Sequence, residues 1–411
     1  MNKTFHVAGP ELWEEIEQLP NDQHPAIVFN SHITGLAVAR NLGKEGIPVI
    51  ALDRDGRAYG LQSKYANIAA YCPNPLVDED GFIQLLIDIG KRLPKKGVLF
   101  PSNDEWVFAV LRNQDQLNAY YFIPFSELET VERILNKRTL YKESERLGIP
   151  IPKTWYPEEG ELTHVPFPCI VKPVEQRSFY DAFQVKVFEV HSQDELTDVL
   201  KKTNGHEVVI QEVIGESLSD FYSLCSYVSP KGEAKGVFVG QKLEQYPLSF
   251  GTGCLVRSAY RQEIVDAGIH ILHTLGYHGI SEAEFIYDKR DQTYKLLDLN
   301  TRTWKWIGLP VAAGIPLPLL AYLEAIGKEA PTYGRQKEPL KWVYFHDYYR
   351  LKQEGGSGGT TGHLTDDELS AIVRGQLPTE TLVDAVFDQD DSNPGVQLIK
   401  NGYGDQYVCP C

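Results

Sequence analysis

The stretch that decides the fold reads SEAEFIYDKRDQTYKLLDLNTR and occupies residues 281–302. Two strand-like segments are joined there by the polar turn 288–292, which predicts a β-hairpin. Because side chains alternate across a strand, Asp298 and Asn300 share one face, and Glu284 faces them from the preceding strand. We therefore expect three oxygen-bearing side chains to meet on one face of this hairpin.

These side chains offer the ligands of a magnesium site. Mg2+ binds a few carboxylate or carbonyl oxygens and completes its shell with phosphate oxygens and water. The alternative is a hairpin whose acids simply face solvent. Asp298, however, lies inside the apolar run LLDL, where an acid is costly to bury without a partner, and this favours the metal site. Arg302 lies further along the same face, where its charge would hold a substrate carboxylate or an acyl phosphate.

The chain around the hairpin alternates strands with polar turns from residue 168 onward. Two helices interrupt them, one capped by Ser192 with Glu195 and one over residues 261–275. This order is typical of an α+β domain built on a mostly antiparallel sheet. The expected strands are residues 169–172, 184–190, 207–212, 221–228, 234–241, 281–287 and 294–300.

The first 125 residues follow a different pattern. A β-rich run at 26–30, helical spacing at 33–42 and a second apolar run at 48–53 form a β-α-β unit, and residues 97–101 repeat its strand. We therefore expect α/β architecture here, a parallel sheet wrapped by helices in the Rossmann manner, in front of the α+β part.

A dinucleotide site in this first part is disfavoured, because the sequence after the first strand, NSHITG at 30–35, holds one glycine instead of the G-x-G-x-x-G pattern. Further on, Ser126 with Glu129 predicts a capping box that opens a helix. Another helix is expected over residues 137–147, where two following prolines stop it.

Composition excludes other classes of protein. The chain has 411 residues and a formal net charge of −16, which argues against a general nucleic-acid binder. Prolines interrupt the most apolar stretch, 307–326, so we expect a buried loop and a helix instead of a membrane span. The acidic first 20 residues lack the apolar run of a signal peptide, and the six scattered cysteines form no zinc or redox pattern. We expect a cytoplasmic protein with no nucleic-acid or membrane partner.

The hairpin resembles the metal hairpin of the ATP-grasp superfamily, in which E-x-N-x-R follows an acid on the preceding strand. Asn300, Thr301 and Arg302 match the version in biotin carboxylase and carbamoyl phosphate synthetase, with Asp298 in place of the commoner glutamate. The resemblance implies an ATP-grasp fold with ATP and Mg2+ as cofactors, or Mn2+ in its place. It also implies Glu284, Asp298 and Asn300 as the metal ligands.

The same resemblance assigns residues to the nucleotide. Lys137 and Lys172 occupy the places of two lysines that grip ATP phosphates, where an ammonium offsets the charge of the moving γ-phosphate. The segment containing Gln211, Glu212 and Val213 resembles the strand and linker on which the adenine lies.

Two further assignments follow from this resemblance. Asp220 or Ser217 would reach the ribose. The loop over the phosphates is usually rich in glycine, whereas residues 175–183 contain none. Arg177 and Ser178 would supply hydrogen-bond donors in their place.

Residues 240–258 resemble the substrate loop of carboxylate–amine ligases, in which Lys242 and Arg257 would hold an acyl phosphate together with Arg302. The alternative is a long hairpin with solvent-facing bases. Residues 101–105, PSNDE, resemble the loop of the N-terminal domain that faces the active site. These loops are most similar to those of amino-acid ligases such as D-aspartate ligase. The implied reaction activates an amino-acid carboxylate as an acyl phosphate and joins it to an amine.

Two other functions stay open. One is a carboxylating enzyme similar to biotin carboxylase or carbamoyl phosphate synthetase, and the other is a catalytically silent ATP-binding module, which the glycine-free segment would suit. We expect small-molecule carboxylate and amine substrates and allow for a homodimer.

The G-x-S-x-G match at 355–359 is taken as a flexible loop, because no buried strand precedes it. The expected division is an N-terminal domain over 1–125, a small lid over 126–206, a catalytic part over 207–330 and an extension over 331–411.

Overall fold

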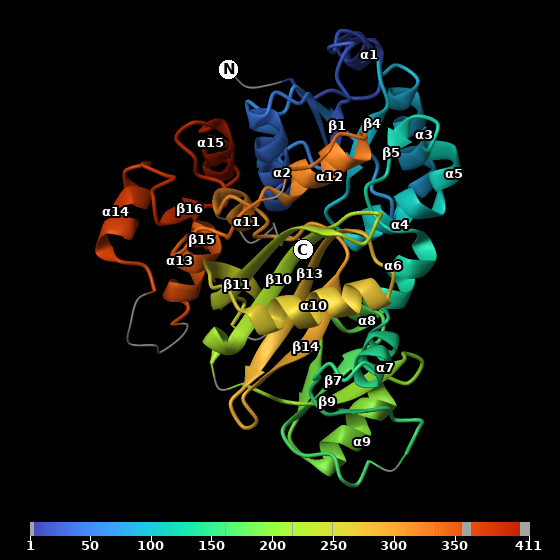
Figure 1. Cartoon of the computed structure of the whole chain (residues 1–411), viewed down its shortest axis with the longest axis vertical. Coiled ribbons are helices and arrows are strands. Elements are labelled where there is room, and N and C mark those ends of the chain that lie inside the picture. Colours follow the sequence, from blue (N-terminus) through green and yellow to red (C-terminus); the bar gives the residue numbers. More distant parts are fainter. Residues whose placement is uncertain are drawn as a thin grey trace.

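The computed structural model describes residues 4–160, 162–215, 217–248, 250–331, 333–355 and 363–402 (Figure 1). The G-x-S-x-G pattern therefore lies, beyond Gly355, outside the described residues, as do Cys409 and Cys411.

The first sheet has five parallel strands in the order β3-β2-β1-β4-β5, which confirms the expected α/β architecture. Alternate residues of its central strand pack on opposite sides, Ile27 and Phe29 in one core and Ala26 and Val28 in another, so helices cover both faces. The strands are β1 (Ala26–Phe29), β2 (Val49–Asp53), β3 (Ile68–Tyr71), β4 (Gly97–Phe100) and β5 (Tyr121–Phe122). The accompanying helices are α1 (Pro10–Glu17), α2 (Ile33–Lys44), η1 (Tyr59–Gln62), α3 (Glu79–Gly90), α4 (Asp104–Arg112) and α5 (Gln114–Leu117).

The predicted capping box at Ser126 is wrong. Helix α6 (Leu128–Leu135) begins after Glu127, and no side chain caps it. The Ser126 hydroxyl instead donates to the carbonyl of His278 at 3.0 Å and accepts the His278 amide at 2.7 Å. A tertiary contact has therefore replaced a local one. Helix α7 (Lys137–Arg146) follows as expected.

A four-stranded sheet in the order β6-β9-β7-β8 forms the lower part of the molecule in Figure 1. Residues 175–183, expected as a loop, form helix α8, because Phe179 is buried in the core of this small sheet. The elements are β6 (Thr154–Trp155), β7 (Cys169–Pro173), α8 (Gln176–Phe183), β8 (Phe188–Val190), α9 (Gln193–Lys202) and β9 (Val208–Glu212). Helix α9 has its expected cap, in which Ser192 accepts the Glu195 amide.

A seven-stranded sheet carries the hairpin, in the order β14-β13-β10-β11-β12-β15-β16. Every neighbouring pair is antiparallel except β15 and β16, so the expected antiparallel part is divided between two sheets. The strands are β10 (Phe221–Val228), β11 (Ala234–Tyr246), β12 (Thr252–Ser258), β13 (Gly279–Asp288), β14 (Thr293–Asn300), β15 (Lys341–Val343) and β16 (Leu382–Asp384). The turn η2 (Leu218–Asp220) precedes β10, and helix α10 (Gln262–Thr274) packs on one face, where Leu224 meets Gly268.

The segment after residue 306 adds helices to the strands β15 and β16, and its residues Leu317 and Leu320 pack against Gly236 of β11. Residues 307–326 were expected as a buried loop followed by a helix; the helix is α12 (Leu317–Ala325), and the short helix α11 (Gly308–Ala312) stands where the loop was expected. Helices α13 (Phe345–Gln353), α14 (Asp366–Val373) and α15 (Asn393–Lys400) complete the chain. Among the described residues, none of the helices has the length and apolar character that a membrane span requires.

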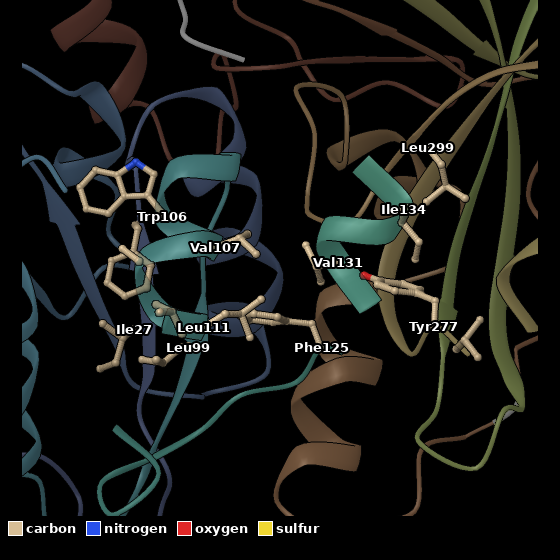
Figure 2. Packing of buried hydrophobic residues seen from close by; sticks show 14 of the residues in the cluster. Ile27, Leu99, Trp106, Val107, Leu111, Phe125, Val131, Ile134, Tyr277 and Leu299 are labelled. Atoms are coloured by element: carbon tan, nitrogen blue, oxygen red, sulfur yellow. The ribbon is translucent and has the colours of Figure 1, made fainter. Parts of the chain in front are cut away.

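One hydrophobic core joins the first sheet to the seven-stranded sheet. Figure 2 shows Ile27, Leu99 and Trp106 on one side, Leu299 on the other, and Phe125 with helix α6 between them. This shared core fixes the carboxyl end of β4 against the end of β14. The loops that follow the parallel strands therefore face the hairpin.

Candidate functional site

The hairpin of β13 and β14 brings the three predicted oxygen ligands together. Glu284 lies directly opposite Asp298, and Asn300 donates from Nδ2 to Glu284 Oε1 at 3.3 Å. The register shifts after Glu284, so that Phe285 pairs with Leu296 and Leu297 is the extra residue. This bulge places both Asp298 and Asn300 on the face of Glu284, with Leu299 in the core on the other face.

Sequence reasoning missed Glu282, which lies on the same face two residues before Glu284. Its side chain is buried, it faces Asn300 across the strands, and its Oε2 accepts the Asn300 amide at 3.2 Å. Burial, with the charge of Glu284, raises the pKa of Glu282 above its usual range. The alternation E-A-E at 282–284 was the available signal, because residues two apart on a strand share a face.

Both predicted phosphate-binding lysines lie beside this cluster. Lys137, at the start of α7, donates from Nζ to Asp298 Oδ2 at 2.6 Å. Lys172, on β7, lies over the Tyr141 ring with Nζ 4.8 Å from its centre. Burial and the charge of Lys137 lower the pKa of Lys172 to about 7. Burial alone would raise the pKa of Asp298, but the two lysines lower it below its usual value.

Arg302 joins the hairpin to the N-terminal sheet. Its Nε donates to Asp104 Oδ1 at 2.7 Å, at the first residue of α4. The charges of Asp104 and Glu282 offset the burial of Arg302 and raise its pKa. Residues 101–105 thus face the site, as the sequence predicted, and Arg302 keeps an acidic partner there.

Lys242 and Arg257 lie on opposite faces of the seven-stranded sheet. On β11, Gly240 is paired with Ser223, which is paired with Glu284, so Gly240 and Lys242 share the face of the site. Arg257 is paired with Gln241, one residue out of phase, and its Nε donates to Gln241 Oε1 at 2.7 Å. Arg257 is exposed on the far face, so its predicted role at the acyl phosphate is wrong.

The predicted nucleotide edge is the end of β9. Gln211 donates to Thr154 at 2.9 Å, and Glu212 Oε2 accepts Arg290 at 2.9 Å. Val213 follows with 40% of its surface exposed, which is unusual for an apolar residue beside a core strand. Asp220 is buried and pairs with Lys289 at 3.0 Å.

The segment after Lys172 approaches the site differently from the prediction. Arg177 and Ser178 are exposed on α8, where Arg177 donates to Asp181 at 3.0 Å, so neither belongs to a loop. Lys186, between α8 and β8, was not predicted. Desolvation lowers its pKa although the side chain keeps contact with solvent, Glu284 opposes that shift, and Lys242, Lys305 and Arg302 reinforce it. Its only sequence signal was a lysine between two strand-like valines.

The donor chemistry of the cluster fits a magnesium ion. Glu284, Asp298 and Asn300 are partly exposed, and their oxygens suit a hard cation that also binds phosphates. Within the described residues, no group of three or more His, Cys, Asp or Glu side chains forms a metal site by itself. Two carboxylates and an amide therefore suit a metal ion that arrives with a phosphate ligand. In this structure Lys137 donates a hydrogen bond to Asp298. Bound phosphates would therefore have to compete with Asp298 for the Lys137 ammonium.

Comparisons with known proteins show what this chain resembles in sequence and in fold. No family model matches the chain. The D-aspartate ligase of Enterococcus faecium is 24% identical over 310 residues, which cover 70% of this chain and 73% of that protein. The L-amino acid ligase from Bacillus licheniformis superposes with a TM-score of 0.56 at 17% identity, covering 74% of each chain. The N5-carboxyaminoimidazole synthetase from Staphylococcus aureus, complexed with ADP, gives 0.61 at 14% identity and covers 82% of this chain and 88% of that one.

Proposed function

We propose, from the premise that this chain belongs to the ATP-grasp superfamily, that it is an ATP-dependent ligase joining a carboxylate to an amine. The observation that carries the proposal is the meeting of Glu284, Asp298 and Asn300 beside Lys137 and Lys172. Oxygen ligands next to two cationic side chains are what a metal-bound triphosphate requires.

Each side chain then has a role that its position supports. Lys137 and Lys172 would bind the phosphates, and Glu284, Asp298 and Asn300 would hold Mg2+ or Mn2+. The metal supplies Lewis-acid stabilisation of the transferring phosphoryl group. The exposed end of β9 at Val213 would bind the adenine, between the two sheets.

The carboxylate side of the reaction belongs to the opposite end of the cluster. A substrate carboxylate would attack the γ-phosphate, and an amine would then displace phosphate to give an amide, ADP and phosphate. Arg302 and Lys242 face this region and would hold the acyl group, because both lie near Glu282. Lys186 would approach the same region from the small sheet.

An amino acid is the carboxylate donor that we favour, because the names of two similar proteins are D-aspartate ligase and L-amino acid ligase. The carboxylating alternative keeps support from the likeness to N5-carboxyaminoimidazole synthetase, which has the same fold. The two differ in the acid that drives ADP release. An amino-acid ligase would release ADP when given an amino acid and an amine, whereas a carboxylating enzyme would require bicarbonate.

The test is a screen of ADP release with amino acids against amines, run beside bicarbonate and repeated with Asp298→Asn. We expect an amino-acid-dependent signal that the variant loses by about 100-fold or more, because one metal carboxylate is gone. Asparagine still accepts from Lys137, so the melting temperature should change little. Full activity in the variant would refute the metal site, and bicarbonate dependence would favour carboxylation. A chain that binds ATP but never releases ADP would be a silent module.

A further inference from the structure

Glu282 is a buried acid of the hairpin that the proposed chemistry does not use. It lies on β13, between β10 and β14, with 5% of its surface exposed. Two neighbouring strands supply donors to it, the hydroxyl of Ser223 from β10 and the amide of Asn300 from β14. Its carboxylate is therefore held from both sides.

The surroundings of Asn300 determine how its amide is oriented. The Asn300 Nδ2 lies 3.2 Å from Glu282 Oε2 and 3.3 Å from Glu284 Oε1. The amide nitrogen therefore donates to both acids, and the amide oxygen faces away from them. Once Glu284 binds a metal ion, Glu282 is the acid that remains for the nitrogen.

We propose that Glu282 is a positioning residue that fixes the amide of Asn300, so that its Oδ1 is presented to the nucleotide-bound metal ion. The inference rests on the proposed function, because it assumes that Asn300 binds the metal. Glu282 itself would not bind the ion. It is buried, whereas Glu284, Asp298 and Asn300 are partly exposed on the same face.

The test measures Mn2+ binding by electron paramagnetic resonance, in the presence of β,γ-imido-ATP, to the full chain and its variants. Glu282→Met keeps the length of the side chain and removes the acceptor, so we expect Mn2+ affinity to fall about 10- to 100-fold, the usual cost of losing a group that orients a metal ligand. Glu282→Gln keeps an oxygen for the Asn300 amide, and its affinity should stay within about threefold of wild type.

Two controls separate orientation from folding and from direct binding. Glu244→Met removes an equally buried acid of β11, paired with Lys352 at 3.1 Å, and should lower the melting temperature without changing Mn2+ affinity. Asn300→Asp adds a third acid beside Glu282 and Glu284 and should weaken Mn2+ binding. Adding Glu282→Gln to that variant should restore part of it, because the hydrogen bond re-forms with donor and acceptor exchanged.

The outcomes distinguish the two proposals. A wild-type chain that binds no Mn2+ with the nucleotide overturns the metal site and this inference together. A wild type that binds Mn2+ while Glu282→Met binds it equally well overturns the inference alone. Glu282→Gln as defective as Glu284→Gln would also overturn it, since Glu282 would then be a ligand.

Discussion

At the scale of single residues, the site is a set of charges that balance one another before any nucleotide binds. Lys137 neutralises Asp298, Arg302 pairs with Asp104, and Lys172 lies buried over an aromatic ring. Burial and the neighbouring charge of Lys137 favour the neutral form of Lys172 more than Asp298 and Glu284 favour the charged form. Lys172 is therefore the residue whose protonation nucleotide phosphates should change most.

The pH dependence of nucleotide binding follows from this state of Lys172. Its pKa is lowered to about 7, so at about pH 8 it is mostly neutral in the free protein. Phosphates favour the charged form, so binding an ATP analogue without metal should take up a proton, and affinity should fall as pH rises through the lowered pKa. Calorimetry in buffers of different ionisation enthalpy measures this uptake.

Lys172→Met should abolish the proton uptake, whereas Lys137→Met should reduce it without abolishing it, because burial still lowers the pKa of Lys172 when the charge of Lys137 is gone. Equal uptake in wild type and Lys172→Met would contradict the assignment of the proton to Lys172.

At the scale of strands, the pairing register decides which side chains can act together. The resemblance to carboxylate–amine ligases placed Lys242 and Arg257 in one substrate loop, but the pairs Lys242 with Val256 and Gln241 with Arg257 put them on opposite faces. A shift of one residue along a strand moves a side chain to the other face of the sheet. The bulge in β14 has the opposite effect, since it brings Asp298 into line with Glu284.

A matched pair of variants tests this arrangement of faces. Lys242→Ala should lower the rate of ligation by about 100-fold, as loss of a charge that stabilises developing negative charge usually does. Arg257→Ala should stay within about threefold of wild type, because its side chain is exposed on the far face. Steady-state ADP release with saturating ATP gives both numbers. A larger loss in Arg257→Ala than in Lys242→Ala would reverse the two assignments.

At the scale of the whole molecule, the segment after residue 330 holds the other parts together. Strand β15 extends the seven-stranded sheet beside β12, and the chain then returns to the N-terminal sheet. There Asp391 accepts Arg40 Nε at 2.9 Å, Ser63 Oγ at 2.6 Å and the Lys64 amide at 2.8 Å. These three hydrogen bonds, which we call the Asp391 clamp, hold the N-terminal part against the segment near the end of the chain.

Breaking the Asp391 clamp should lower the free energy of unfolding more than breaking the exposed ion pair of Asp390 with Lys64. Asp391→Ala leaves the buried charge of Arg40 without its acid, and we expect the free energy of unfolding to fall by about 3–5 kcal/mol. Asp390→Ala removes an exposed, solvent-screened pair with Lys64 and should leave the free energy of unfolding almost unchanged. Denaturant unfolding followed by tryptophan fluorescence measures both. Equal losses would show that Asp391 does not act as a clamp.

Local patterns in the sequence sufficed to predict much of the fold. The β13–β14 hairpin and the cap of α9 rest on contacts close in sequence, the parallel first sheet follows from its repeated strand and helix patterns, and each is confirmed. The joint approach of Lys137 and Asp298 came from resemblance, since no periodicity links residues so far apart. The capping box at Ser126 and the loop at 175–183 were wrong because distant partners, His278 and the core around Phe179, stabilise a different local structure.

The sequence by itself determined the residue types of the site and the strand alternation that gathers its oxygen ligands, because both follow from neighbours along the chain. Tertiary structure alone decided that Arg257 lies on the far face of the sheet and that Glu282 accepts a hydrogen bond from Asn300. It also decided that residues beyond 330 complete the sheet. The physical reason is that strand register, burial and paired charges depend on segments brought together only when the sheets close around their shared core.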